Sequence, residues 1–149
     1  LNILSVDLVT RTLVVSRNIH CPVIVVSGQQ RELRLLDEPS QPIGVHSRTR
    51  PVITELPITP GLHVVVFTDG VLSAGVRTSE RLDVAAFVHD QLQVCPTETC
   101  ARCLADALLA RAVELDRNRP GDDVTVLVVS VVARQRPDDV RRLSVRLPL

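Results

Sequence analysis

Several residue types are missing from this chain of 149 residues, which has no methionine, tryptophan, tyrosine or lysine and only two phenylalanines. Hydrophobic residues still make up 45% of the sequence, enough for one core in a chain the size of one domain. Valine and leucine must therefore fill that core. All 17 positive charges are arginines, a usage that codon bias in the source genome explains as well as any function does.

Concentrated charge and long apolar runs are also missing. The net charge is zero and the arginines are spread along the chain, so there is neither a basic footprint for nucleic acid nor a polybasic patch for a membrane surface. No apolar run approaches the roughly 18 residues of a membrane span, and no signal peptide is visible. We therefore expect no nucleic-acid partner and no membrane contact in this segment.

The chain also lacks an initiator methionine, and residues 1–4 already resemble the interior of a strand. We expect the chain to be a piece of a longer protein, truncated before its first residue.

Near the middle of the chain, an apolar segment ends in an aspartate. Residues 64–67 are apolar and lead into Asp69, whereas later in the chain Asp122 and Asp123 precede the strand-like residues 124–129. Two neighbouring antiparallel strands would bring the end of the first segment beside the start of the second. The pattern therefore predicts that Asp69 and Asp122 lie close together at one rim of a sheet.

Short apolar runs separated by turn residues predict strands before this centre. They occupy residues 1–9, 13–16, 23–26, 33–36 and 52–56. The first four favour an antiparallel meander. Residues 37–50 carry prolines and a glycine among polar residues and are expected to form a loop.

Two helices are expected after the central strand. Thr78 or Ser79 can cap the first, which would run to Gln93, and Thr97 can cap the second, which would run to Arg117. One face of the second helix is apolar at three- and four-residue spacing and should pack on a sheet. A strand at 124–132, a polar linker at 134–139 and an edge strand at 143–147 would complete the chain. This order favours an α+β layered fold.

The aspartates have two interpretations. Carboxylates held about 4 Å apart repel by roughly 4 kcal/mol at an effective dielectric of 20, so a site that gathers them usually holds a cation. Oxygen ligands suit Mg²⁺ or Mn²⁺, which could activate a water and screen a phosphate. Alternatively, Asp69, Asp122 and Asp123 are turn residues only, for which aspartate is common. Spacing alone favours this second interpretation.

Several motifs shift the balance towards a metal site because they resemble those of a known family. Residues 67–71 (FTDGV) and 121–127 (GDDVTVL) resemble the last two metal-binding motifs of the PPM family of metal-dependent protein serine/threonine phosphatases. The branch they most resemble contains stage II sporulation protein E and the Rsb stress-response phosphatases (RsbU, RsbX). Residues 17–22 are similar to its asparagine-alanine-glycine-histidine-proline motif, with His20 kept and the glycine absent. Two of its proline-glycine turns also have counterparts, at residues 42–44 and 59–61.

The resemblance spans residues 1–133 and implies the C-terminal part of such a domain, an antiparallel β-sandwich flanked by helices with its N-terminal portion missing. Residues 134–149 are then a linker and a terminal edge strand. It also implies that Asp69 and Asp122 are catalytic metal ligands and that Asp123 is a further metal-site residue.

The implied reaction is hydrolysis of phosphoserine or phosphothreonine by a water that two or more Mn²⁺ or Mg²⁺ ions activate. The family's earlier motifs, which supply the aspartate that bridges the metals, would lie upstream of Leu1. We therefore predict an active parent protein and a chain of 149 residues that binds metal weakly and is inactive alone.

The implied substrate is a phosphorylated regulator of the STAS-type anti-sigma-factor antagonist class, in sporulation or stress signalling. The rival prediction is a catalytically inactive relative that uses the same sandwich as a sensory or protein-binding module. An aspartate-containing motif upstream would favour the enzyme. Formation of a homodimer stays open.

Cysteine and histidine offer weaker candidates. Cys100 and Cys103 form a lone CxxC pair on the apolar helix face, which favours buried side chains over a zinc or redox site. With no secretion signal, the four cysteines predict reduced thiols and a cytoplasmic location. His63 lies inside the central strand and is expected to be a packed residue, not a ligand.

Overall fold

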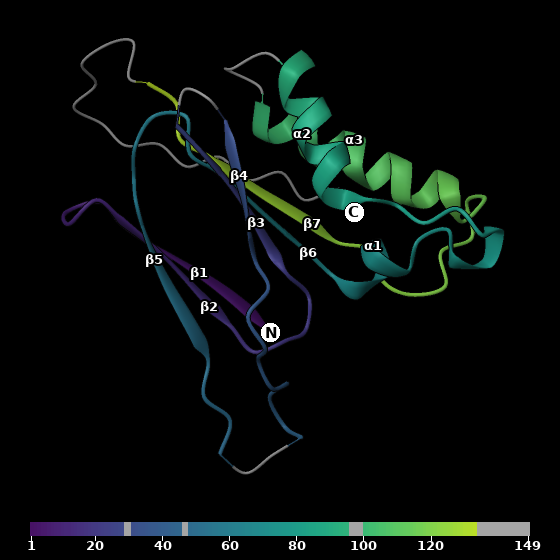
Figure 1. Cartoon of the computed structure of the whole chain (residues 1–149), viewed down its shortest axis with the longest axis horizontal. Coiled ribbons are helices and arrows are strands. Elements are labelled where there is room, and N and C mark those ends of the chain that lie inside the picture. Colours follow the sequence, from purple (N-terminus) through teal and green to yellow (C-terminus); the bar gives the residue numbers. More distant parts are fainter. Residues whose placement is uncertain (29–30, 46–47, 96–99, 134–149) are drawn as a thin grey trace, which may run out of the picture.

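The protein folds into three layers, as shown by a computed structural model that describes residues 1–28, 31–45, 48–95 and 100–133 (Figure 1). A three-stranded antiparallel sheet packs on one face of a four-stranded antiparallel sheet, and two helices cover the other face. The predicted α+β class, with an antiparallel sandwich flanked by helices, is confirmed.

The first sheet has the strand order β1-β2-β5 and the second has the order β4-β3-β6-β7. The strands are β1 (Asn2–Asp7), β2 (Thr12–Arg17), β3 (Val23–Ser27), β4 (Glu32–Leu36), β5 (Val52–Pro57), β6 (His63–Phe67) and β7 (Val126–Ser130). The helical segments are α1 (Asp69–Ser73), the 3₁₀ helix η1 (Val76–Thr78), α2 (Val84–Val94) and α3 (Cys100–Leu115).

Two hydrophobic cores hold the layers together, and aliphatic residues supply almost all of both. Between the sheets, Leu13 and Val15 of β2 pack with Val64 of β6. Between the larger sheet and the helices, Val65 of β6 packs with Leu104 of α3. Strand β6 is therefore buried on both faces, which explains its unbroken apolar sequence.

The predicted meander of the first four strands is wrong. The β1-β2 and β3-β4 hairpins form, but β2 pairs with β5, with Arg17 opposite Val52, and β3 pairs with β6. The chain leaves the first sheet after β2 and enters the second at β3. The hydroxyl of Ser40 fixes this crossing, because it accepts from the Ile19 amide at 3.1 Å and donates to the Ile19 carbonyl at 2.6 Å.

The first helix was expected from Thr78 or Ser79, but α2 begins later. Gly75 and Ser79 have φ values of 78° and 61°, so the intervening residues form only the single turn η1. Asp83 caps α2 instead, since its carboxylate accepts a hydrogen bond from the Ala86 amide at 3.0 Å. The short helix α1 was not expected from the sequence.

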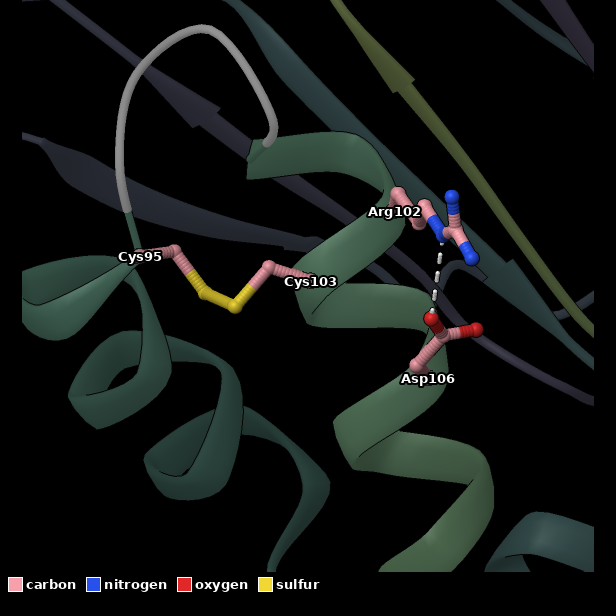
Figure 2. Close-up of a disulfide and its surroundings, with 4 residues drawn as sticks. All are labelled: Cys95, Arg102, Cys103 and Asp106. Atoms are coloured by element: carbon pink, nitrogen blue, oxygen red, sulfur yellow. Dashed lines mark ion pairs between the residues drawn. A yellow bond between two sulfur atoms is a disulfide. The ribbon is translucent and has the colours of Figure 1, made fainter.

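Helix α3 buries the apolar face that its sequence predicts, including Leu104 and Leu108. The proposed cap Thr97 lies outside the described residues, and the helix ends at Leu115. The expectation of four reduced thiols is wrong, because a disulfide joins Cys95, at the end of α2, to Cys103 in α3 (Figure 2). Cys21 and Cys100 are buried free thiols.

The last predicted strand is shorter than expected, because only Val126–Ser130 of residues 124–132 form β7. The linker at 134–139 and the edge strand at 143–147 lie outside the described residues. Within the described ranges, no helix has both the length and the apolar character to cross a membrane.

Candidate functional site

The pairing of β6 with β7 places the two aspartate motifs at the same end of the larger sheet. The strands are antiparallel, with Val65 opposite Val128 and Phe67 opposite Val126. The chain therefore leaves β6 through residues 68–70 where it also enters β7 through residues 122–125 (Figure 1).

Thr68 ties the two segments together. Its amide donates to the Thr125 carbonyl at 3.1 Å, which extends the strand ladder by one residue. Its hydroxyl donates to the Asp123 carbonyl at 2.8 Å and accepts from the Thr125 amide at 2.9 Å. One side chain thus satisfies two backbone groups of the turn that carries Asp122.

Gly70 lets the backbones approach closely. A Cβ at this position would lie 3.0 Å from the carbonyl carbon of Asp123, and still closer to its oxygen, and 3.3 Å from Cγ2 of Val124. Real side chains do not tolerate the contact with that oxygen, so the corner after β6 requires glycine. This glycine and the Thr68 hydroxyl fix the separation of the two aspartate-bearing segments.

The candidate side chains lie on the surface at this corner. Asp69 is the first residue of α1 and is exposed, as are Asp122 and Asp123. One carboxylate oxygen of Asp122 accepts from the Asp123 amide at 2.8 Å, which fixes that side chain against its own turn. The structure thus brings together the segments that carry all three predicted residues.

The loop between β2 and β3 is close enough to this corner for the charge of Asp69 to affect it. Burial raises the pKa of the Cys21 thiol, and the negative charge of Asp69 raises it further. Cys21 is therefore within electrostatic range of the candidate site, where sequence reasoning did not place it. His20, the residue kept from the family motif, is exposed.

His63 lies at the opposite end of β6 and takes no part in the candidate site. Its Nδ1 is 2.8 Å from the hydroxyl oxygen of Ser130, and its side chain is buried. Burial lowers its pKa, and the positive charge of Arg31 lowers it further. The prediction of a packed histidine is confirmed.

A surface cavity of about 400 Å³ opens beside Asp122. Its lining residues are Ser73, Val76, Arg77, Asp116, Gly121 and Asp122. Asp116 is buried and accepts a hydrogen bond from the Gly75 amide at 3.1 Å, so the end of α3 holds the turn that follows α1. Sequence reasoning did not find Asp116 or Arg77, because only the packing of α3 against this turn brings them beside Asp122.

The donor set partly fits a divalent cation. Exposed carboxylates on adjoining segments offer the oxygen ligands that Mg²⁺ and Mn²⁺ prefer. Among the described residues, however, no three histidine, cysteine, aspartate or glutamate side chains are grouped so that they could hold a metal ion. A complete site would therefore need ligands in addition to those that these residues supply.

Comparisons with known proteins agree with this architecture. The family model described as stage II sporulation protein E (SpoIIE) matches residues 1–132. No curated protein matches the chain.

Three solved structures illustrate the likeness in fold. The Mn-presoaked phosphatase domain of SpoIIE from Bacillus subtilis has a TM-score of 0.66 at 12% identity, covering 92% of this chain and 58% of its own. The structure of the RsbU and RsbW domains of Rv1364c from Mycobacterium tuberculosis has a TM-score of 0.55 at 21% identity. The match covers 89% of this chain and 36% of that structure. The SiaA-PP2C domain of Pseudomonas aeruginosa has a TM-score of 0.59 at 20% identity. The match covers 81% of this chain and 47% of that structure. The chain thus spans little more than half of the first of these structures.

Proposed function

Because this chain belongs to the stage II sporulation protein E (SpoIIE) family, on the PPM-type branch of RsbU-like phosphatases, we propose that the full-length protein is a metal-dependent protein phosphatase acting on phosphoserine or phosphothreonine. One observation carries the proposal for this chain. The Thr68 hydroxyl and the closeness of Gly70 to Asp123 join the two segments that bear Asp69 and Asp122.

In this proposal, Asp69 and Asp122 hold Mn²⁺ or Mg²⁺ at the exposed rim, with further ligands from outside the described residues. When bound there, the cations supply an activated water and screen the charge of the phosphate. Asp123 contributes through its backbone, because its carbonyl accepts from Thr68 and its amide donates to Asp122. The cavity beside Asp122 leaves room for the substrate chain.

We further propose that the substrate is a phosphorylated regulatory protein of the STAS-type anti-sigma-factor antagonist class. The motifs at residues 67–71 and 121–127, which resemble those of the sporulation and stress-response branch, support this choice. Dephosphorylation in the cytoplasm is proposed on the family resemblance alone, because the Cys95–Cys103 disulfide removes the support that four reduced thiols would have given.

The test is turnover by the full-length protein. We expect release of phosphate from a phosphoserine peptide with Mn²⁺, no release with EDTA, and a loss of at least about a hundredfold in kcat for Asp69→Asn and Asp122→Asn, the size of a typical electrostatic catalytic contribution. The exposed Asp90 of α2 provides the matched control, Asp90→Asn, which should keep its activity. A wild-type protein that is inert with both Mn²⁺ and Mg²⁺ would contradict the proposal and favour the inactive binding module.

A further inference from the structure

Arginine side chains surround a second cavity directly beside the candidate site. This cavity has a volume of about 210 Å³ and is lined by Arg77, Thr78, Asp116, Arg117 and Arg119. Arg77 and Asp116 also line the larger cavity that contains Asp122, so the two cavities adjoin. A peptide chain that extends from the larger cavity past Arg77 would reach Arg117 and Arg119.

Within the described part of the chain, the three arginines that line this cavity outnumber its carboxylates. The only carboxylate in the lining is Asp116, which is buried and accepts from the Gly75 amide. The ion pairs among the described residues join Arg102 to Asp106 and Arg111 to Glu114, and neither involves the cavity arginines.

The arginines have different roles. The guanidinium of Arg77 donates to the backbone carbonyl of Arg119, and a Cβ at Gly121 would lie 3.4 Å from it. Arg77 therefore positions the turn that leads to Asp122. The side chains of Arg117 and Arg119 are exposed, which leaves them able to bind a partner.

Arg117 occupies a backbone position that normally favours glycine. The Arg117 amide donates to the Glu114 carbonyl at 2.8 Å and the Asn118 amide to the Val113 carbonyl at 2.9 Å, the hydrogen-bond pattern of a Schellman motif at the end of α3. Arg117 and the following Asn118 both have left-handed φ values, of 53° and 57°. This turn places the Arg117 side chain in the lining of the arginine-rich cavity.

The positive region is short. On its other side Arg117 lines a further cavity, of about 220 Å³, that also contains Glu80 and Glu114. A ligand that suits this arrangement carries negative charge close to the phosphate that would lie near Asp122. Its acidic stretch is short, because the glutamates beyond Arg117 would repel a longer one.

We propose that Arg117 and Arg119 bind the carboxylates of an acidic segment that flanks the phosphorylated residue of the protein substrate. This inference rests on the proposed phosphatase function and adds a requirement for substrate sequence. An exposed charge pair contributes up to about 1 kcal/mol, or about fivefold in affinity. Acidic flanks should therefore strengthen binding by up to about fivefold per arginine engaged, and salt should weaken this preference.

The primary test measures binding, not turnover. Two fluorescein-labelled phosphoserine peptides, one with aspartates beside the phosphoserine and one with asparagines, are titrated with the full-length protein in EDTA and followed by anisotropy. We expect the acidic peptide to bind about 2- to 25-fold more tightly, the range for two exposed charge pairs. Arg117→Gly and Arg119→Gln should each reduce this ratio, and the double variant should bring it close to one.

Arg11→Gly is the matched control. Arg11 is also an exposed arginine in the left-handed conformation, with φ of 54°, but it lies in the β1-β2 turn, far from α1 (Figure 1). Glycine accepts this conformation at both positions, so neither substitution should impair folding. A dipole interaction of Arg117 with the end of α3 would affect stability but not the ratio of peptide affinities.

Equal affinities of the wild type for the two peptides, or an unchanged ratio in the double variant, would overturn the inference. Turnover of p-nitrophenyl phosphate, which has no flanking residues, is measured in parallel with Mn²⁺. Its absence in the wild type would count against the proposed phosphatase, whereas the anisotropy ratio would still decide whether the arginines bind an acidic segment.

Discussion

Replacement of Gly70 by alanine tests the close contact that sets the geometry of the site. In an ordinary helix this change would stabilise the fold by about 0.5–1 kcal/mol, because glycine loses more backbone entropy on folding. Here the new methyl group would collide with the Asp123 carbonyl and approach Val124. Overpacking of this kind typically costs about 1–3 kcal/mol, and the obstacle is backbone, which yields less easily than a side chain.

A backbone obstacle places the cost in the upper part of that range, at about 2–3 kcal/mol, so the net loss in the free energy of unfolding for Gly70→Ala is about 1–2.5 kcal/mol. Urea unfolding followed by far-UV circular dichroism suits a protein without tryptophan or tyrosine. Gly121→Ala is the matched control, because its Cβ would meet only the end of the Arg77 side chain, at 3.4 Å. An equal or higher urea midpoint for Gly70→Ala would refute the reasoning, since it would mean that the two segments are not in close contact.

The other predictions concern single interactions elsewhere in the fold. Thr68→Val leaves the Asp123 carbonyl without its 2.8 Å hydrogen-bond donor and should lower the free energy of unfolding by about 1–3 kcal/mol. Thr68→Ser keeps the hydroxyl and should recover most of this loss. Equal urea midpoints for Thr68→Val and the wild type would contradict the prediction. The disulfide closes a separation of 8 residues, so dithiothreitol should lower the free energy of unfolding by about 2 kcal/mol in the native protein and not in the Cys95→Ser/Cys103→Ser variant. Burial lowers the pKa of His63 in the folded state from its usual 6.5, so the unfolded state binds the proton more readily. The contribution of His63 to the free energy of unfolding should be constant above pH 6.5 and fall as the pH drops below it. In the His63→Gln variant, the free energy of unfolding should fall less between pH 6.5 and 5 than it does in the wild type. An identical fall in the two proteins would show that other groups cause it.

The sequence predicts the central strand and the turn to Asp69 because local rules decide both. An unbroken apolar run is typical of a strand covered on both faces, and β6 is covered by the other sheet and by the helices. The partner of β2 could not be predicted in the same way. Its pairing with β5 depends on a crossing between sheets, at which the Ser40 hydroxyl holds Ile19, and no local pattern indicates such a contact.

The beginning of α2 shows how a correct signal can be assigned to the wrong residue. Thr78 and Asp83 are both good caps, but Thr78 already donates to the carbonyls of Gly75 and Leu115. Asp83 is the residue whose carboxylate faces the Ala86 amide. The same tertiary contacts, between the turn after α1 and the end of α3, placed Asp116 beside Asp122.

The central claim is that Asp69 and Asp122 together hold a divalent cation, and calorimetric titration of the full-length protein with Mn²⁺ tests it most directly. Substitution of groups around a metal commonly weakens its binding 10–100-fold, and loss of a direct ligand should do at least as much. We therefore predict that Asp69→Asn and Asp122→Asn each weaken Mn²⁺ binding by at least about tenfold, with Asp90→Asn unchanged. Affinities equal to the wild type in both site variants would contradict the account.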